Sequence, residues 1–129
     1  MKCALCSGVI REMSFAAHCA YAAALDYDGL EVAAMADRIA TAKLGEETPE
    51  ALIDKWLPSG HVAHIQVNDG NGRGPGQGGD HFAPVLSALR RHNYTGTIAV
   101  ELFEYYFDGP ASAARAIGYL RGTEEALHV

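Results

Sequence analysis

One stretch, from His61 to Phe103, limits the possible folds of this chain more than any other part of the sequence. An apolar segment, 61–67, leads into a glycine-rich segment, 68–79, and a second apolar segment closes the stretch at 99–103. Between them, apolar residues recur at helical spacing over 82–89. A strand, a helix and a second strand form a parallel crossover unit, which carries its chemistry in the loops that follow the strands. We therefore expect an α/β fold whose functional residues lie near the ends of these two strands.

The rest of the chain repeats this alternation of short apolar segments with helical ones. Ser14 and Thr48 are suited to cap helices, and Pro49 and Pro110 suit positions at the start of a helix. Strands that alternate with helices predict an α/β domain with a parallel sheet. Beyond the opening stretch, we expect strands at 2–6 and 30–33 and helices at 15–25, 36–44, 49–57 and 110–122.

The composition is that of one ordinary globular domain, with 129 residues of which 49% are hydrophobic and 20% charged. The formal net charge of −6 disfavours nucleic acid or an anionic membrane as the main partner, because either would require a basic face. No apolar run reaches the ~20 residues of a membrane span, and the first residues lack the pattern of a signal peptide. We therefore expect a single domain, 1–129, in the cytoplasm.

Three cysteines, Cys3, Cys6 and Cys19, do not make a disulfide framework, because their number is odd and the chain is long enough for an ordinary core. Cys3 and Cys6 have the Cys-x-x-Cys spacing. On a strand, however, residues three apart point to opposite faces, whereas redox pairs lie at helix N-termini. We favour buried free thiols, and redox or metal chemistry is the alternative.

Several segments of the opening stretch occur in the order of a known family. They are His64-Ile65-Gln66-Val67-Asn68-Asp69, the loop Asn71-Gly72-Arg73-Gly74-Pro75-Gly76-Gln77-Gly78, the turn Tyr94-Thr95-Gly96 and the strand Val100-Glu101-Leu102-Phe103. Together they resemble the C-terminal end of the sugar phosphate isomerase/epimerase family, which has the xylose-isomerase-like TIM barrel and includes ketose 3-epimerases and hydroxypyruvate isomerases. Over the whole chain, 1–34 resembles the first two strands of such barrels and 48–122 the last two.

The resemblance implies a fold that one chain does not complete. A TIM barrel has eight strands in about 250 residues, whereas this chain has four predicted strands and lacks the middle of the family pattern. The strands that resemble the seventh, eighth, first and second of the barrel are neighbours around its circle. We therefore expect a four-stranded parallel half of a TIM barrel with flanking helices. Its open edges would be completed by dimerisation, because exposed strand edges favour pairing with another chain.

The resemblance also implies a divalent metal, Mn²⁺ or Mg²⁺, and a pair of catalytic carboxylates. Glu101 matches the metal ligand of the last strand, and Gln66 occupies the position of the family's histidine ligand. Glutamine is a neutral oxygen donor, suited to Mg²⁺ or Mn²⁺ but weaker than imidazole for transition metals. The family abstracts a proton next to a carbonyl and exchanges it through an enediolate. Glu101 would be one carboxylate of this exchange, and the second would be Glu31, or a Glu101 or Glu31 of a partner chain. The alternative for Glu31 is that it faces water at a sheet edge.

The glycine-rich loop favours an anionic ligand. Its backbone amides could approach a sugar phosphate, with Arg73 as the charged clamp and with His64 and Asn68 as further substrate contacts. The loop lacks the Lys-Ser/Thr of a P-loop, so nucleotide binding is disfavoured. Simpler roles compete with these, because His64 could be a rim residue and Glu101 a solvated strand end.

These patterns support two functions. The first is a sugar or sugar phosphate isomerase or epimerase, of the aldose-ketose isomerase or ketose 3-epimerase type, that forms a homo-oligomer. The second is a non-catalytic remnant that binds a sugar phosphate or a partner chain. Gln66 and the absent strands favour loss of the chemistry, whereas Glu101 and the Arg73 loop favour its retention.

Overall fold

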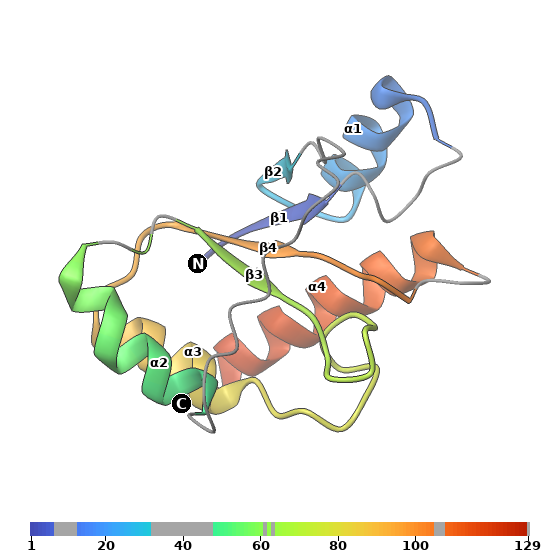
Figure 1. Cartoon of the computed structure of the whole chain (residues 1–129). Coiled ribbons are helices and arrows are strands. Elements are labelled where there is room, and N and C mark those ends of the chain that lie inside the picture. Colours follow the sequence, from blue (N-terminus) through green and yellow to red (C-terminus); the bar gives the residue numbers. More distant parts are fainter. Residues whose placement is uncertain (7–12, 32–47, 61, 63, 105–107, 129) are drawn as a thin grey trace.

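A computed structural model describes residues 1–6, 13–31, 48–60, 62, 64–104 and 108–128 (Figure 1). Strands and helices alternate along the chain as the sequence predicts. The predicted helix at 36–44, His61 and the end of the strand predicted at 30–33 lie outside the described residues. The elements are β1 (Lys2–Cys6), α1 (Phe15–Ala24), β2 (Gly29–Glu31), α2 (Pro49–Trp56) with a 3₁₀ turn at Leu57–Ser59, β3 (Ile65–Val67), α3 (Ala83–Arg91), β4 (Thr97–Val100) and α4 (Gly109–Ala126).

The strands pair in parallel in the order β2-β1-β4-β3. β1 lies inside the sheet because it is apolar on both faces, with every residue from Cys3 to Cys6 buried. The register places Ala4 beside Ala99 and Val67 beside Val100. All the carboxyl ends of the strands therefore lie along one edge of the sheet.

The prediction of a four-stranded half barrel completed by dimerisation is wrong. The described residues form a small α/β domain with a short, open parallel sheet and helices beside it. The edge strands β2 and β3 contain three residues each. Each edge strand pairs with its neighbour over only three residues, Gly29–Glu31 with β1 and Ile65–Val67 with β4. The sequence pattern misled because open sheets and barrels share the same alternation of strands and helices.

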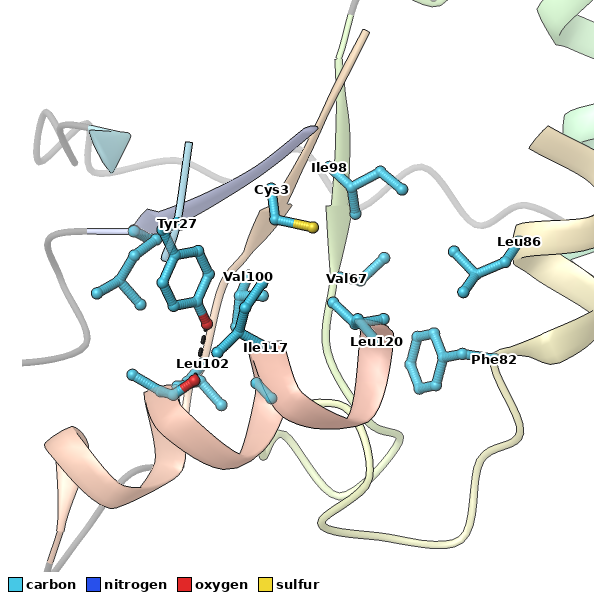
Figure 2. Packing of buried hydrophobic residues seen from close by; sticks show 14 of the residues in the cluster. Cys3, Tyr27, Val67, Phe82, Leu86, Ile98, Val100, Leu102, Ile117 and Leu120 are labelled. Carbon is cyan, nitrogen blue, oxygen red and sulfur yellow. Dashed lines mark hydrogen bonds between the residues drawn. The ribbon is translucent and has the colours of Figure 1, made fainter. Parts of the chain in front are cut away.

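One face of the sheet packs against α4, where Ile117 and Leu120 meet Val100 and Val67 (Figure 2). The neighbouring helices continue this layer, since α3 contacts both α4 and α2. On the other side of α4, the hydroxyl of Tyr21 on α1 donates to the carbonyl oxygen of Pro110 at 2.7 Å. The helices therefore follow one another as α1, α4, α3 and α2, in the same order as the strands that they cover.

Two tyrosines fix the position of α4, one before β2 and one on α4 itself. Tyr27 is buried, and its hydroxyl donates to the carbonyl oxygen of Ala113 at 2.8 Å (Figure 2). This burial raises the pKa of Tyr27 well above its usual range. Tyr119 on α4 meets the ring of Phe82 edge to face, with 6.0 Å between the ring centroids. The hydrogen bond of Tyr27 and the ring contact of Tyr119 thus specify how α4 lies on the apolar core.

The cysteines agree only in part with the prediction of buried free thiols. Cys3 and Cys6 are buried and outside any disulfide, as predicted, whereas Cys19 is outside any disulfide but exposed on α1. Burial raises the pKa of the Cys3 thiol to about 11, so this thiol is unreactive at neutral pH. Within the ranges that the structure describes, no helix is long and apolar enough to cross a bilayer.

Candidate functional site

The carboxyl edge of the sheet brings together most of the residues that the sequence singles out. Val67 pairs with Val100, and the amide of Glu101 donates to the carbonyl oxygen of Val67 at 3.2 Å. This bond extends the β3–β4 ladder by one residue, so Asn68 and Glu101 lie level just beyond the two strands. Ligands of open parallel sheets bind at this edge.

Alternation along β3 decides which face these side chains share. Val67 is buried in the core beneath the sheet, whereas His64 and Gln66 are exposed. Because successive strand side chains alternate, His64, Gln66 and Asn68 lie along the face opposite the helices. Glu101 belongs to the same face, since its neighbours Val100 and Leu102 are both buried in the core. We call these four residues, His64, Gln66, Asn68 and Glu101, the polar row.

Small residues lie beside the polar row on the next two strands of the sheet, β4 and β1. Gln66 pairs in register with Ala99, which is fully buried, and Ala99 pairs in turn with Ala4. Glu101 is half-buried, and it interacts with other groups of the chain, as do His64 and Gln66. Gln66, Asn68 and Glu101 therefore lie close together at the carboxyl edge, whereas His64 precedes the first residue of β3.

Glu31 lies on the far side of β1 from Glu101. The register pairs Glu31 with Cys6, which is level with the end of β4. Two strand spacings therefore separate the backbones of Glu31 and Glu101, or about 10 Å. The structure does not describe the Glu31 side chain. The two predicted catalytic carboxylates are thus too far apart at the backbone to be direct neighbours, and Cys6 lies on the strand between them.

Asp69 organises the glycine-rich loop, and sequence reasoning missed it. This carboxylate is only 1% exposed. Its Oδ1 accepts from the amides of Gly70 and Asp80, both at 3.1 Å, and its Oδ2 accepts from the amide of Gly78 at 2.8 Å. An aspartate followed by glycine is a known turn signal, because the side chain bonds nearby amides. That signal was available in Asp69-Gly70, although it does not reveal the bonds to amides nine and eleven residues away.

Further bonds tie the loop to its surroundings. Asn71 bridges it, donating to the carbonyl oxygen of Gln77 at 3.0 Å and accepting from the amide of Arg73 at 2.9 Å. The carbonyl oxygen of Gly72 accepts from the amides of Phe103 and Glu104, both at 2.9 Å. These two bonds hold the loop against the segment that carries Glu101. The loop is therefore an ordered wall beside the polar row.

These bonds change the prediction of an anion site in the loop. The amides of Gly70, Gly78 and Asp80 already donate to the carboxylate of Asp69, and the amide of Gly70 also donates to Asp80 Oδ2 at 2.6 Å. A phosphate bound to these amides would have to displace a buried carboxylate. The exposed side chain of Arg73 is the part of the predicted clamp that a phosphate could still reach.

A hollow of about 570 Å³ opens beside β3, between α2 and the start of α3. Leu52 lines it from α2, Leu57 from the 3₁₀ turn that follows, Ile65 from β3 and Val85 from α3. Gln66 and Asn68 also line it, together with acidic and histidine side chains from the starts of the two helices. This volume lies in the range of small-molecule sites.

We found no protein-family model and no curated protein that matches this chain. The resemblance to the isomerase and epimerase family therefore depends on the quoted residues alone.

Metal ligands are sparse at this site. Over the described ranges, no three or more His, Cys, Asp or Glu side chains converge as a metal site would require. Glu101 and Gln66 supply oxygen donors of the kind that Mg²⁺ and Mn²⁺ accept. Such an ion would need water or substrate oxygens for most of its coordination shell, which is common for Mg²⁺.

Proposed function

We propose that this protein binds a small sugar or sugar phosphate at the carboxyl edge of its sheet and transfers a proton next to the sugar's carbonyl group. One observation carries the proposal. The polar row places two carboxamides and a half-buried carboxylate at the carboxyl edge, where parallel sheets bind their ligands, with the imidazole of His64 on the same face before the start of β3. The residue types suit a molecule that has many hydroxyl groups.

Recognition would use the amides of the polar row. Gln66 and Asn68 each offer both donors and an acceptor, so each can bond a hydroxyl group in either direction. The exposed guanidinium of Arg73 would favour a phosphorylated sugar, because its planar fork matches two phosphate oxygens. The hydrogen bonds of the loop would fix the backbone of Arg73, which reduces the conformational entropy lost when a ligand binds.

Glu101 would act as the base of the reaction. It would take the proton from the carbon next to the carbonyl, and the electron pair would move onto the carbonyl oxygen to give an enediolate. Return of the proton to the opposite face of that carbon gives the epimer. Return to the former carbonyl carbon, with transfer of the hydroxyl proton to the former carbonyl oxygen, gives the isomer. Glu31 would be the second carboxylate, across the substrate from Glu101. With backbones about 10 Å apart, the two carboxylates would act from opposite sides of a bound sugar.

The proposal also allows a divalent ion, whose coordination shell the substrate oxygens would complete. Glu101 and Gln66 would hold it, and its chemistry would be to polarise the substrate oxygens.

The test is hydrogen exchange at the reacting carbon. The protein is incubated in D₂O with a panel of ketoses and ketose phosphates, with and without Mg²⁺ or Mn²⁺, and proton NMR follows the signal next to the carbonyl. We expect the signal of at least one sugar to decay and Glu101→Gln to abolish the decay. Glu104→Gln is the matched control, because Glu104 is an exposed carboxylate three residues away. Decay at the same rate in Glu101→Gln would contradict the role of Glu101. If the signal decays for none of the sugars tested, the proposed reaction is contradicted.

Binding without chemistry is the second candidate. It is favoured by Gln66, which stands where the resembling family has histidine, and by the separation of Glu31 from Glu101. The same NMR samples distinguish the two, because saturable shifts of the sugar signals without exchange indicate binding alone. Arg73→Ala should then weaken binding of a phosphorylated sugar more than binding of its unphosphorylated form.

A further inference from the structure

The hollow between α2, β3 and α3 has an acidic end and an apolar end. Glu50 in the first turn of α2 and Asp80 just before α3 line it, together with Gln66 at the strand. Farther along α2, Leu52, Ile53 and Leu57 form an apolar wall. The distance from Leu52 to Leu57 along the helix axis is about 7.5 Å, at 1.5 Å per residue.

The charges at the acidic end decide what kind of head group fits. Among the described residues that line the hollow there is no Lys or Arg, whereas Glu50 and Asp80 contribute two negative charges. The starts of α2 and α3 lie at the same end, and each contributes roughly half a positive charge. These dipoles offset about one of the two carboxylates. With two carboxylates against about one positive charge from the dipoles, the acidic end keeps a net negative charge.

We propose that this hollow binds a small amphipathic cation, with an ammonium head at Glu50 and Asp80 and an unbranched apolar tail along α2. The walls offer aliphatic side chains for the tail, and the tail would replace water against Leu52, Leu57 and Val85. This site is separate from the reaction proposed for Glu101, although Gln66 and Asn68 line both. A ligand in the hollow would lie beside the polar row.

The probes are hexylammonium, octylammonium and octanoate, measured by isothermal titration at pH 8 with amide NMR shifts to locate the site. Each buried methylene contributes about fourfold in affinity, so octylammonium should bind about fifteenfold more tightly than hexylammonium. Octanoate has the same tail but a negative head, and it should bind more than tenfold more weakly than octylammonium. Equal binding of the two octyl compounds, or no binding of octylammonium, would overturn the proposal.

Three variants locate the site. Leu52→Trp fills the hollow from a half-buried position outside the main core and should abolish binding. Glu50→Gln removes a half-buried charge without changing the size of the side chain, and it should reduce the preference for octylammonium over octanoate several-fold. Glu125→Gln is the control, because Glu125 is exposed near the end of α4. Unchanged octylammonium binding in folded Leu52→Trp and Glu50→Gln would overturn the site.

Two more measurements test what occupies the hollow and whether it acts independently of Glu101. Light scattering over a range of protein concentrations tests whether a second copy of the chain fills the hollow. Shifts of Leu52 and Val85 amides that follow dimer formation would overturn the small-molecule proposal. Octylammonium binding to Glu101→Gln keeps this inference apart from the proposed reaction, since the cation should bind normally even where proton exchange is lost.

Discussion

Replacing Asp69 with alanine tests the most heavily bonded polar side chain that the structure describes in the glycine-rich loop. The carboxylate is 1% exposed and accepts three backbone amides, from Gly70, Gly78 and Asp80. The amide of Gly70 keeps a second acceptor, Asp80 Oδ2 at 2.6 Å. The substitution therefore leaves two amides, those of Gly78 and Asp80, without their bonds to this carboxylate.

The size of the loss follows from those two amides. A buried donor left without an acceptor costs about 1–3 kcal/mol. Gly78 and Asp80 are themselves exposed, so water can replace part of each bond, and the lower half of that range applies. We expect Asp69→Ala to lower the free energy of unfolding by about 2–4 kcal/mol. For 129 residues the whole stability is on the order of 6–19 kcal/mol, so the loss should be plain in a urea titration.

A matched variant separates this effect from the removal of any aspartate. Asp108 caps α4 by accepting from one amide, that of Ala111 at 2.9 Å, in an exposed setting. Asp108→Ala should therefore cost only about 1 kcal/mol. Hydrogen exchange supplies a local readout, since the amides of Gly78 and Asp80 should lose protection in Asp69→Ala alone. A loss for Asp69→Ala no larger than that for Asp108→Ala, with protection retained, would refute the reasoning.

Three further outcomes are expected. Hydrogen bonds from His92, and then from Arg91, hold the pKa of Asp54 below its usual 3.8. Ionised Asp54 therefore stabilises the fold above pH 3.8, and this stability is lost as the pH falls through its lowered pKa. Asp54→Asn should reduce the fall of the urea midpoint between pH 5 and pH 2. At neutral pH a thiol reagent should label the exposed Cys19 of the folded protein and leave the buried Cys3 unlabelled. Early labelling of Cys3 would contradict its burial. Gly76→Ala should cost about 1–3 kcal/mol by thermal unfolding because φ is +79° there, and an unchanged melting temperature would contradict that strain.

The sequence was a good guide to the local elements, because their signals are local. Ser14 and Thr48 cap α1 and α2 through bonds to amides three residues ahead, as predicted from residue type. The helical spacing that begins at Phe82 also marks residues that the structure buries, Val85 and Leu89 among them. Caps and periodicity depend on neighbours within one or two turns, which a sequence states directly.

The curvature and extent of the sheet could not be predicted in the same way. The half-barrel prediction joined a correct alternation of elements to the shape of a resembling family. How far β3 pairs with β4 depends on backbone geometry over the whole sheet, which no single residue type fixes.

The site was predicted in part for similar reasons. The period of two along β3 was enough to place His64, Gln66 and Asn68 on one face. The role of Asp69 was missed because its partners return from up to eleven residues away through an irregular loop. The same bonds to Asp69 occupy the loop amides that the glycine-rich pattern predicts to approach a phosphate.

The position of α4 has a consequence for how the chain acquires its structure during synthesis. α4 receives bonds from Tyr21 and Tyr27, 89 and 86 residues earlier in the chain, and Glu124 near its end pairs with the terminal amine of Met1 at 3.1 Å. The ribosome makes this helix after every other described element. Contacts so distant in sequence slow folding, so the nascent sheet must wait with its apolar face uncovered until α4 emerges. Chaperone demand during translation should therefore be highest just before the last helix leaves the exit tunnel.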